Sequence, residues 1–234
     1  MSHKQQIFCF TFAGGNAVFF DDIESDLEEF EFIKNEYAGH GTRHREKYYV
    51  SFNELADDMF TLLKERYSDS DYALFGYSMG SITLVEVLKR IITDSGMPEP
   101  KEVFLAAHEP QTKYELIGFT DNELDDWVKQ RTLRFGGVPE KLVNNRAFWR
   151  MYLPIYRNDY SIIGNYRFED LDIKTKIPAT IFYSETDTPF ENMKKWNKYF
   201  IGECKFYCYE GEHFFIQEHH KEMAEIIRNR MNRR

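Results

Sequence analysis

The stretch Gly76-Tyr77-Ser78-Met79-Gly80 decides how the rest of this 234-residue chain is interpreted. It follows the apolar run Tyr72-Ala73-Leu74-Phe75 and precedes residues 81–92, whose apolar side chains recur at helical spacing. The order strand, tight turn, helix is the setting in which G-x-S-x-G forms a nucleophile elbow. Chance alone produces this pattern in roughly one chain in ten of this length. The interpretation therefore depends on partners for Ser78 elsewhere in the sequence.

Apolar runs alternate with helical patterns along most of the chain. Strands are expected at 7–12, 30–37, 72–77, 103–107, 178–184 and 205–209. Helices are expected at 17–27, after the capping-box residues Ser51 and Glu54, and at 81–92, 190–200 and 216–231. This alternation predicts the α/β class, with a mainly parallel central sheet and helices on both faces. The length suits a single domain, 1–234.

Residues 111 to about 168 interrupt the alternation. They are rich in charged and aromatic side chains and contain no clear strand. Short helices are expected at 121–132, 140–145 and 146–156. The position of this segment, after the strand at 103–107, predicts a helical lid inserted into the domain.

Composition excludes several classes of function. The formal net charge is −9, which disfavours nucleic acid as a partner because phosphate binding needs a basic surface. The first residues lack the apolar core of a secretory signal, and no run approaches the length of a membrane span. The odd number of cysteines (Cys9, Cys204 and Cys208), placed in apolar runs, predicts reduced thiols, no metal site and a cytoplasmic location.

A base for Ser78 is expected later in the chain. A serine hydroxyl is a weak nucleophile that needs a base, and the base needs an acid to orient it. In α/β-hydrolases the chain order is serine, acid, histidine, which sets aside His3, His40 and His44. His213 follows the strand at 205–209 and is the candidate base, with His108 as the alternative. His219 and His220 fall inside the last helix, where we expect them to be solvated.

The acid and the oxyanion donors are expected on other loops at the carboxyl edge of the sheet. Asp187 follows the strand at 178–184 and is the candidate acid, with Glu185 as the alternative. The backbone N–H of Met79, directly after the nucleophile, is one expected oxyanion donor. Ala13, in the glycine-rich turn after the first strand, is the other. The predicted architecture is thus an α/β-hydrolase fold with a Ser78–His213–Asp187 triad.

These motifs resemble the type II thioesterases of nonribosomal peptide and polyketide biosynthesis. The resemblance spans nearly the whole chain and is carried by residues 10–15, 39–43, 76–81, 107–110, 135–139, 153–159, 166 and 212–215. Residues 135–139 and 153–159 are more specific than the elbow, which the whole hydrolase superfamily shares. The chain departs from the family pattern at Gly39, where proline is usual, and at Tyr77, where histidine is usual. Neither position carries a proton-transfer role, so these departures concern substrate preference.

The resemblance implies a discrete hydrolase that removes acyl groups from the phosphopantetheine thioester of acyl or peptidyl carrier proteins. We expect a monomer, because no feature of the sequence argues for an oligomer. It would clear stalled or wrongly primed chains and would use no cofactor or metal of its own. Gly14 of the first turn and Phe135, Trp149 and Tyr156 of the lid are the candidate substrate-binding residues. Sequence alone does not separate lid aromatics that line an acyl channel from those that pack the lid.

Two other functions fit parts of the sequence. A small-molecule carboxylesterase or lipase would use the same triad, because the residues alone specify acyl hydrolysis and not thioesters. A non-catalytic carrier-binding protein of the same fold is disfavoured by the intact serine, acid and histidine. Basic side chains offered to an acidic carrier, or simply solvated, are Arg43, Arg45, Lys194, Lys195 and Lys198.

Overall fold

A six-stranded parallel sheet forms the centre of the molecule. The structure is a computed structural model and describes residues 4–94, 96–111 and 119–233. Within these residues the strand order is β2-β1-β3-β4-β5-β6, and every neighbouring pair is parallel. The strands are β1 (Gln6–Phe10), β2 (Glu31–Lys34), β3 (Tyr72–Tyr77), β4 (Glu102–Ala106), β5 (Ala179–Tyr183) and β6 (Cys204–Cys208). The predicted mainly parallel α/β fold is confirmed.

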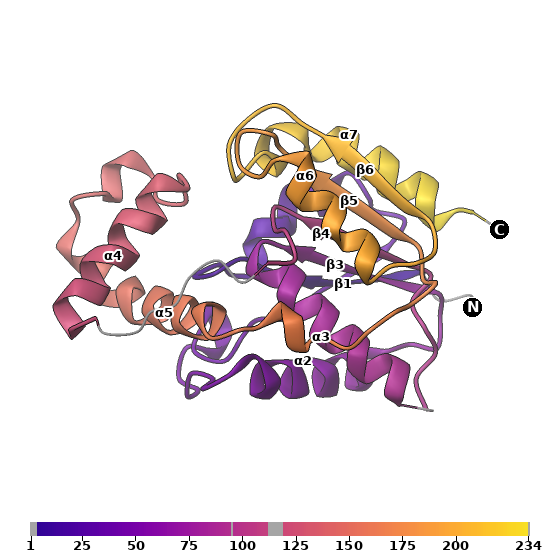
Figure 1. Cartoon of the computed structure of the whole chain (residues 1–234), viewed down its shortest axis with the longest axis horizontal. Helices are drawn as coiled ribbons and strands as arrows, with labels where there is room; N and C mark the ends of the chain where they lie inside the picture. The colour runs from indigo at the N-terminus through magenta and orange to yellow at the C-terminus, as the bar shows by residue number, and fades with distance from the viewer. Residues whose placement is uncertain (1–3, 95, 112–118, 234) are drawn as a thin grey trace.

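Both faces of the sheet are covered, as the alternation of side chains in β1 shows. Phe8 and Phe10 belong to the hydrophobic core on one face, whereas Ile7 and Cys9 belong to the core on the other. The first face is covered by α2 (Phe52–Arg66) and α3 (Met79–Thr93), which pack side by side (Figure 1). The opposite face is covered by α1 (Asp21–Ser25) and α7 (Ile216–Met231). Strands buried on both faces read as continuous apolar runs, which is why the sequence reveals them clearly.

Several helix boundaries follow from side-chain chemistry. The Ser51 hydroxyl accepts a hydrogen bond from the Glu54 N–H and so caps α2. The Glu54 carboxylate accepts from the Val50 N–H instead of that of Ser51, so only half of the predicted capping box forms. The predicted helices at 17–27 and 190–200 are each divided into a short 3-10 and a short α segment. These are η1 (Ala17–Phe20) with α1, and α6 (Phe190–Met193) with η5 (Lys194–Lys198).

A pair of helices between β4 and β5 stands beyond the sheet, at the left of Figure 1. They are α4 (Asp121–Arg134) and α5 (Arg146–Gly164), which pack against each other and are joined through η3 (Glu140–Leu142). Thr120 and Glu123 form a complete capping box at the start of α4. Residues 112–118 of the predicted lid lie outside the described residues.

Helix α5 is longer than the sequence predicts. The prediction ended it at residue 156, but the helix continues to Gly164 and carries Pro154 in its interior. A proline removes one helical hydrogen bond and usually ends a helix. Here the residues after it, Tyr156, Tyr160 and Ile162, are buried against the core, so packing keeps the helix intact.

The three cysteines are all free, as predicted. Cys9 is buried in β1, and burial raises the pKa of its thiol well above the usual value. Cys204 is partly buried, and burial raises its pKa to about 12. Cys208, at the end of β6, is exposed. Among the described residues, no helix is long and apolar enough to cross a membrane.

Candidate active site

Ser78 sits at a sharp, strained turn between β3 and α3. Its backbone has φ 55° and ψ −117°, a conformation that L-residues rarely adopt. The flanking Gly76 and Gly80 do not have a positive φ. They are needed because no Cβ fits at either position. A Cβ on Gly76 would lie 2.3 Å from the Gly80 carbonyl oxygen, and a Cβ on Gly80 would lie 1.9 Å from that of Phe10. The elbow therefore needs glycine for close backbone approach, while Ser78 itself bears the strain.

Ser81 fixes the elbow through hydrogen bonds to the backbone, a role that the sequence does not reveal. Its buried hydroxyl lies 3.0 Å from the carbonyl oxygens of Gly76 and Ala106 and 3.2 Å from the Ala106 N–H. The Ser78 N–H also donates to the Ala106 carbonyl, at 2.8 Å. These bonds tie the turn to the end of β4, so the serine is fixed relative to the sheet.

The predicted serine, histidine and acid lie in hydrogen-bond contact. His213 Nε2 is 2.9 Å from Ser78 Oγ, and His213 Nδ1 is 2.9 Å from Asp187 Oδ2. Both ionisable side chains are nearly buried, with 8% of the His213 side chain and 7% of the Asp187 side chain exposed. A hydrogen bond from Ser184 Oγ to the Gly211 carbonyl joins the two loops that carry them. The arrangement can transfer the serine proton to an imidazole held in one tautomer.

Aromatic rings enclose His213. The Phe135 ring, from the segment after α4, lies 4.3 Å from the imidazole centroid, and Phe214 meets it edge-on at 5.2 Å. The Tyr77 hydroxyl donates to the His213 carbonyl at 2.6 Å. The departure from the family pattern at Tyr77 therefore affects more than substrate preference, because this side chain anchors the backbone of the candidate base.

The turn after β1 contains Ala13, the second predicted oxyanion donor. In this turn the Gly15 N–H donates to the Phe12 carbonyl at 2.9 Å, and the Gly14 N–H donates to Asp159 Oδ2 at 2.6 Å. Ala13, whose amide is not used in either bond, lines the cavity beside Ser78. The Met79 N–H is at the start of α3, where a helix leaves its amides without intrahelical acceptors. Met79 thus follows the serine directly and Ala13 lines its cavity, and their role as oxyanion donors stays a prediction.

A largely aromatic cavity opens from Ser78 toward the two lid helices. Phe135 and Tyr156, two predicted substrate-binding residues, line it together with Phe12, Ala13, Ala107, His108, Arg131, Thr132, Gly137, Tyr160, Ile163, His213 and Phe214. Trp149 and Gly14 do not line it. The Trp149 indole donates to the Val143 carbonyl within the lid, and Gly14 lies beneath the Tyr156 ring. The prediction did not distinguish these packing roles from cavity lining, because both use aromatic or small residues.

Comparison with known proteins matches this geometry. A model of the thioesterase domain family matches residues 5–231 of the chain. The chain belongs to this family. The medium-chain S-acyl fatty acid synthase thioesterase of Rattus norvegicus is 25% identical over 218 residues, which cover 91% of this chain and 82% of the relative. The gramicidin S biosynthesis protein GrsT of Aneurinibacillus migulanus is 24% identical over 233 residues, with 96% and 88% covered.

A solved structure extends the comparison to three dimensions. The type II thioesterase BorB from the borrelidin biosynthetic cluster superposes with a TM-score of 0.84 at 25% identity, covering 99% of this chain and 95% of that one. The resemblance to type II thioesterases that the sequence predicts is therefore confirmed, and the protein is a thioesterase of the α/β-hydrolase fold.

The alternative acid and base have other contacts in the thioesterase. Glu185 Oε1 accepts a hydrogen bond from the Phe190 N–H at the start of α6. His108 lines the cavity, its Nδ1 lies 2.7 Å from the Glu109 carbonyl, and its backbone carbonyl accepts from the Trp196 indole N–H. The contacts of His213 described above are instead with Ser78 and Asp187. The histidines of α7 are only partly solvated, since His220 Nδ1 pairs with Asp26 at 2.6 Å.

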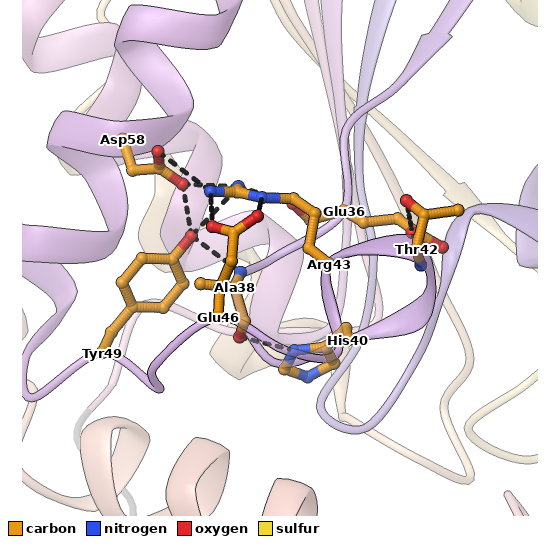
Figure 2. Close-up of polar contacts among 8 residues, drawn as sticks. All are labelled: Glu36, Ala38, His40, Thr42, Arg43, Glu46, Tyr49 and Asp58. Atoms are coloured by element: carbon orange, nitrogen blue, oxygen red, sulfur yellow. Dashed lines mark hydrogen bonds and ion pairs between the residues drawn. The ribbon is translucent and has the colours of Figure 1, made fainter.

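Three of the basic residues offered to a carrier have polar contacts within the protein. Lys195 Nζ donates to the side-chain oxygens of Gln111 and Asn192 at 2.7 and 2.9 Å. Arg43 is half-buried and forms ion pairs with Glu46 and Asp58, as Figure 2 shows. Lys194 forms an ion pair with Glu191. Arg45, Lys195 and Lys198 are exposed. Arg43 therefore organises a loop of the thioesterase. Lys194, Lys195 and Lys198 lie at the surface of η5.

Proposed function

We propose that this thioesterase hydrolyses acyl groups from the phosphopantetheine thioester of carrier proteins in nonribosomal peptide or polyketide synthesis, and so removes stalled or wrongly primed chains. The main support is that Ser78, His213 and Asp187 are joined by hydrogen bonds and that Ser78 lines a cavity with aromatic walls beside the lid. Similarity to a type II thioesterase and to a gramicidin S biosynthesis protein supports the class of substrate.

In the proposed reaction His213 takes the proton of Ser78 as the hydroxyl oxygen attacks the thioester carbonyl. The N–H groups of Met79 and Ala13 hold the oxyanion. The carbon–sulfur bond then breaks, and His213 returns the proton to the leaving thiolate. Water, deprotonated by His213, hydrolyses the acyl-Ser78 ester and releases the carboxylic acid. Asp187 keeps the imidazole in the required tautomer and stabilises its charged form.

The walls of the cavity suit the acyl part of the substrate. Rings of Phe12, Phe135, Tyr156 and Tyr160 give apolar surface that suits an acyl chain. Thiolate is a good leaving group, so positioning and oxyanion stabilisation are the main demands on the protein. All of the proposed steps use side chains and backbone amides, so the proposal includes no cofactor.

The carrier protein is part of the proposal because the thioester is attached to it. Carrier domains are often acidic, and the exposed Lys195 and Lys198 lie on one short segment with Lys194. We propose that Lys195 and Lys198 make electrostatic contact with the acidic carrier.

The decisive experiment compares acyl-carrier thioester, acyl-pantetheine and p-nitrophenyl ester as substrates of the full chain and of Ser78→Ala. We expect Ser78→Ala to lower kcat on all three by at least about 10⁴-fold, because the nucleophile is lost. We expect kcat/KM of the unaltered protein to be higher for the carrier thioester than for acyl-pantetheine. The acyl groups should span short, medium and aminoacyl chains.

Two controls give the experiment its meaning. His44→Gln, an exposed histidine far in sequence from the triad, should leave kcat unchanged, whereas His213→Gln should abolish turnover. Near-normal turnover by Ser78→Ala would contradict the proposed mechanism. A preference for the ester with no gain from the carrier would instead identify a small-molecule esterase.

A further inference from the structure

A buried ion pair connects the lid to the oxyanion turn. We infer that Asp159 of α5, held by His40, is a positioning residue that sets the oxyanion turn by accepting the Gly14 N–H. The inference rests on the proposed reaction at Ser78. Asp159 lies on the lid helix, Gly14 in the turn after β1 and His40 in the loop after β2, so three distant segments meet at one carboxylate.

A single oxygen atom makes both contacts. Asp159 Oδ2 lies 2.6 Å from the Gly14 nitrogen and 2.9 Å from His40 Nε2. The side chains of His40 and Asp159 are 2% and 1% exposed. A carboxylate removed from water in this way is costly unless it is paired and hydrogen-bonded. The pair with His40 supplies that compensation and leaves the Gly14 amide with a strong acceptor.

The contacts of the imidazole indicate that it is charged. His40 Nδ1 lies 3.1 Å from the Ala38 carbonyl, which can only accept, and Nε2 faces the Asp159 carboxylate. Both nitrogens therefore carry a proton when Asp159 is ionised. Burial disfavours the imidazolium, but the charge and hydrogen bond of Asp159, with the Ala38 carbonyl and Glu36, outweigh it and raise the pKa of His40.

The loop behind His40 is itself fixed, as Figure 2 shows. The Tyr49 hydroxyl accepts from the Ala38 N–H at 2.9 Å and donates to Asp58 at 2.5 Å. Arg43 contacts the same Asp58 carboxylate at 2.6 Å. His40 therefore approaches Asp159 from a rigid support anchored on α2, and its position does not depend on the lid.

The turn is shaped to receive α5. Gly14 has φ +77°, and a Cβ there would lie 2.0 Å from the Tyr156 ring, one helical turn before Asp159. The lid helix thus covers Gly14 with Tyr156 and binds its amide with Asp159. The Gly14 N–H shares its peptide plane with the Ala13 carbonyl, and the Ala13 N–H lies in the preceding plane, two dihedral angles away. The bond from the Gly15 N–H to the Phe12 carbonyl closes the turn across Ala13, so the Asp159 contact restricts these two angles and with them the direction of the Ala13 N–H. The oxyanion donor is in place when α5 is docked on His40.

The test is Asp159→Asn, which keeps the side-chain volume but removes the charge. The amide of asparagine gives the His40 imidazolium no counter-charge, and its neutral oxygen accepts the Gly14 N–H more weakly than a carboxylate does. We expect kcat to fall about 10- to 100-fold, the effect of a small misplacement of a catalytic group, with KM within about threefold of the original. A pantetheine trifluoromethyl ketone, whose adduct with Ser78 carries an oxyanion, should lose affinity in proportion to kcat/KM. A non-hydrolysable acyl-pantetheine amide should bind as before.

The matched control is Glu86→Gln on α3, which removes the charge of another largely buried carboxylate, bonded to Arg90 and Tyr166, without touching Gly14, His40 or Asp159. It should lower the melting temperature while kcat stays within about twofold. A fall in the melting temperature of Asp159→Asn with unchanged kcat and unchanged ketone affinity would overturn the inference and leave a purely structural ion pair. Equal losses of kcat in both variants would also overturn it.

The same measurements separate this inference from the proposed function. The oxyanion hole serves an ester carbonyl as well as a thioester carbonyl, so kcat on p-nitrophenyl esters should show the same fall in Asp159→Asn. If carriers are not the substrate but ester kcat falls, the proposed function fails and the role of Asp159 stands. If kcat of Asp159→Asn is unchanged on both substrates, the role of Asp159 fails alone.

Discussion

Individual glycines at the elbow are required by contacts that the sequence motif does not describe. The space that a side chain at residue 80 would fill is occupied by the Phe10 carbonyl of β1, and the space at residue 76 by the Gly80 carbonyl. The motif therefore encodes the close packing of α3 on two strands. Ser78, in contrast, adopts a strained φ of 55° that glycine would adopt more easily, because the hydroxyl is needed there.

Gly80→Ala tests this packing. A methyl group 1.9 Å from the Phe10 carbonyl forces α3 away from β1, so we expect the free energy of unfolding to fall by about 1–3 kcal/mol. The displacement also moves the Met79 amide, so kcat should fall. Gly96→Ala is the matched control, because the nearest atom to its Cβ would be a side-chain oxygen of Asp94 at 3.2 Å. Urea unfolding of both variants, with esterase rates, decides whether the effect is local to the elbow.

At this scale the sequence predicted the residues whose chemistry is distinctive. Ser78, His213 and Asp187 were predicted from motif and chain order, and the structure places them in contact. Ser81 and Asp159 were not predicted, since a hydroxyl or carboxylate that binds backbone gives no periodic signal. His40 was set aside because it precedes the serine, an argument that applies to a base but not to a positioning residue.

Elements of the lid show where local patterns give way to packing. Helix α5 passes through Pro154 because its later residues are buried against the core, and no local pattern contains that information. The strands were predicted to within a few residues, since burial on both faces makes them continuous apolar runs. Helix α7 was predicted with the bounds that the structure has, Ile216–Met231, because one face alone carries its apolar residues.

Docking of α5 should depend on pH through His40. The ionisable groups near it are Asp159 from the lid, Glu36, and Tyr37, whose ring lies edge-on to the imidazole at 5.6 Å and whose pKa is raised by burial. The folded-state pKa of His40 lies above its unfolded value of about 6.5. Its stabilisation is therefore complete below about pH 6.5 and is lost as pH rises through the folded pKa.

The measurement is the free energy of unfolding of the unaltered protein and of His40→Gln between pH 6 and pH 9. We expect the difference between the two to be largest at the acidic end and to shrink as pH rises. A difference that stays constant across this range would show that folding does not raise the pKa of His40.

At the scale of the whole molecule, a buried ion pair joins the last helix to the amino end of β4. Arg230, near the end of α7, pairs with Glu102 of β4 at 2.8 Å and with Glu203, just before β6, at 2.6 Å. Burial raises the pKa of Glu102, although Arg230 and Thr180 oppose this effect. The C-terminal end of α7 is thereby attached to the amino ends of two strands, at the opposite edge of the sheet from the triad.

Arg230→Ala leaves Glu102 buried without its counter-charge, so we expect the free energy of unfolding to fall by about 3–5 kcal/mol. Arg233→Ala removes an ion pair with the same Glu203, but Arg233 is 47% exposed, and the loss should stay below about 1 kcal/mol. Chemical denaturation of both variants makes the comparison. Similar losses would show that burial does not distinguish the two arginines.

The distribution of thiols makes the thioesterase suitable for site-selective labelling without engineering. The thiolate is the form of cysteine that attacks thiol reagents, and the raised pKa values of Cys9 and Cys204 keep both protonated at neutral pH. Cys208 is exposed at the end of β6, five residues before His213. A maleimide dye added in stoichiometric amount should therefore attach at this position, at the carboxyl end of β6, and mass spectrometry of the labelled peptides would show whether Cys9 and Cys204 stay unmodified.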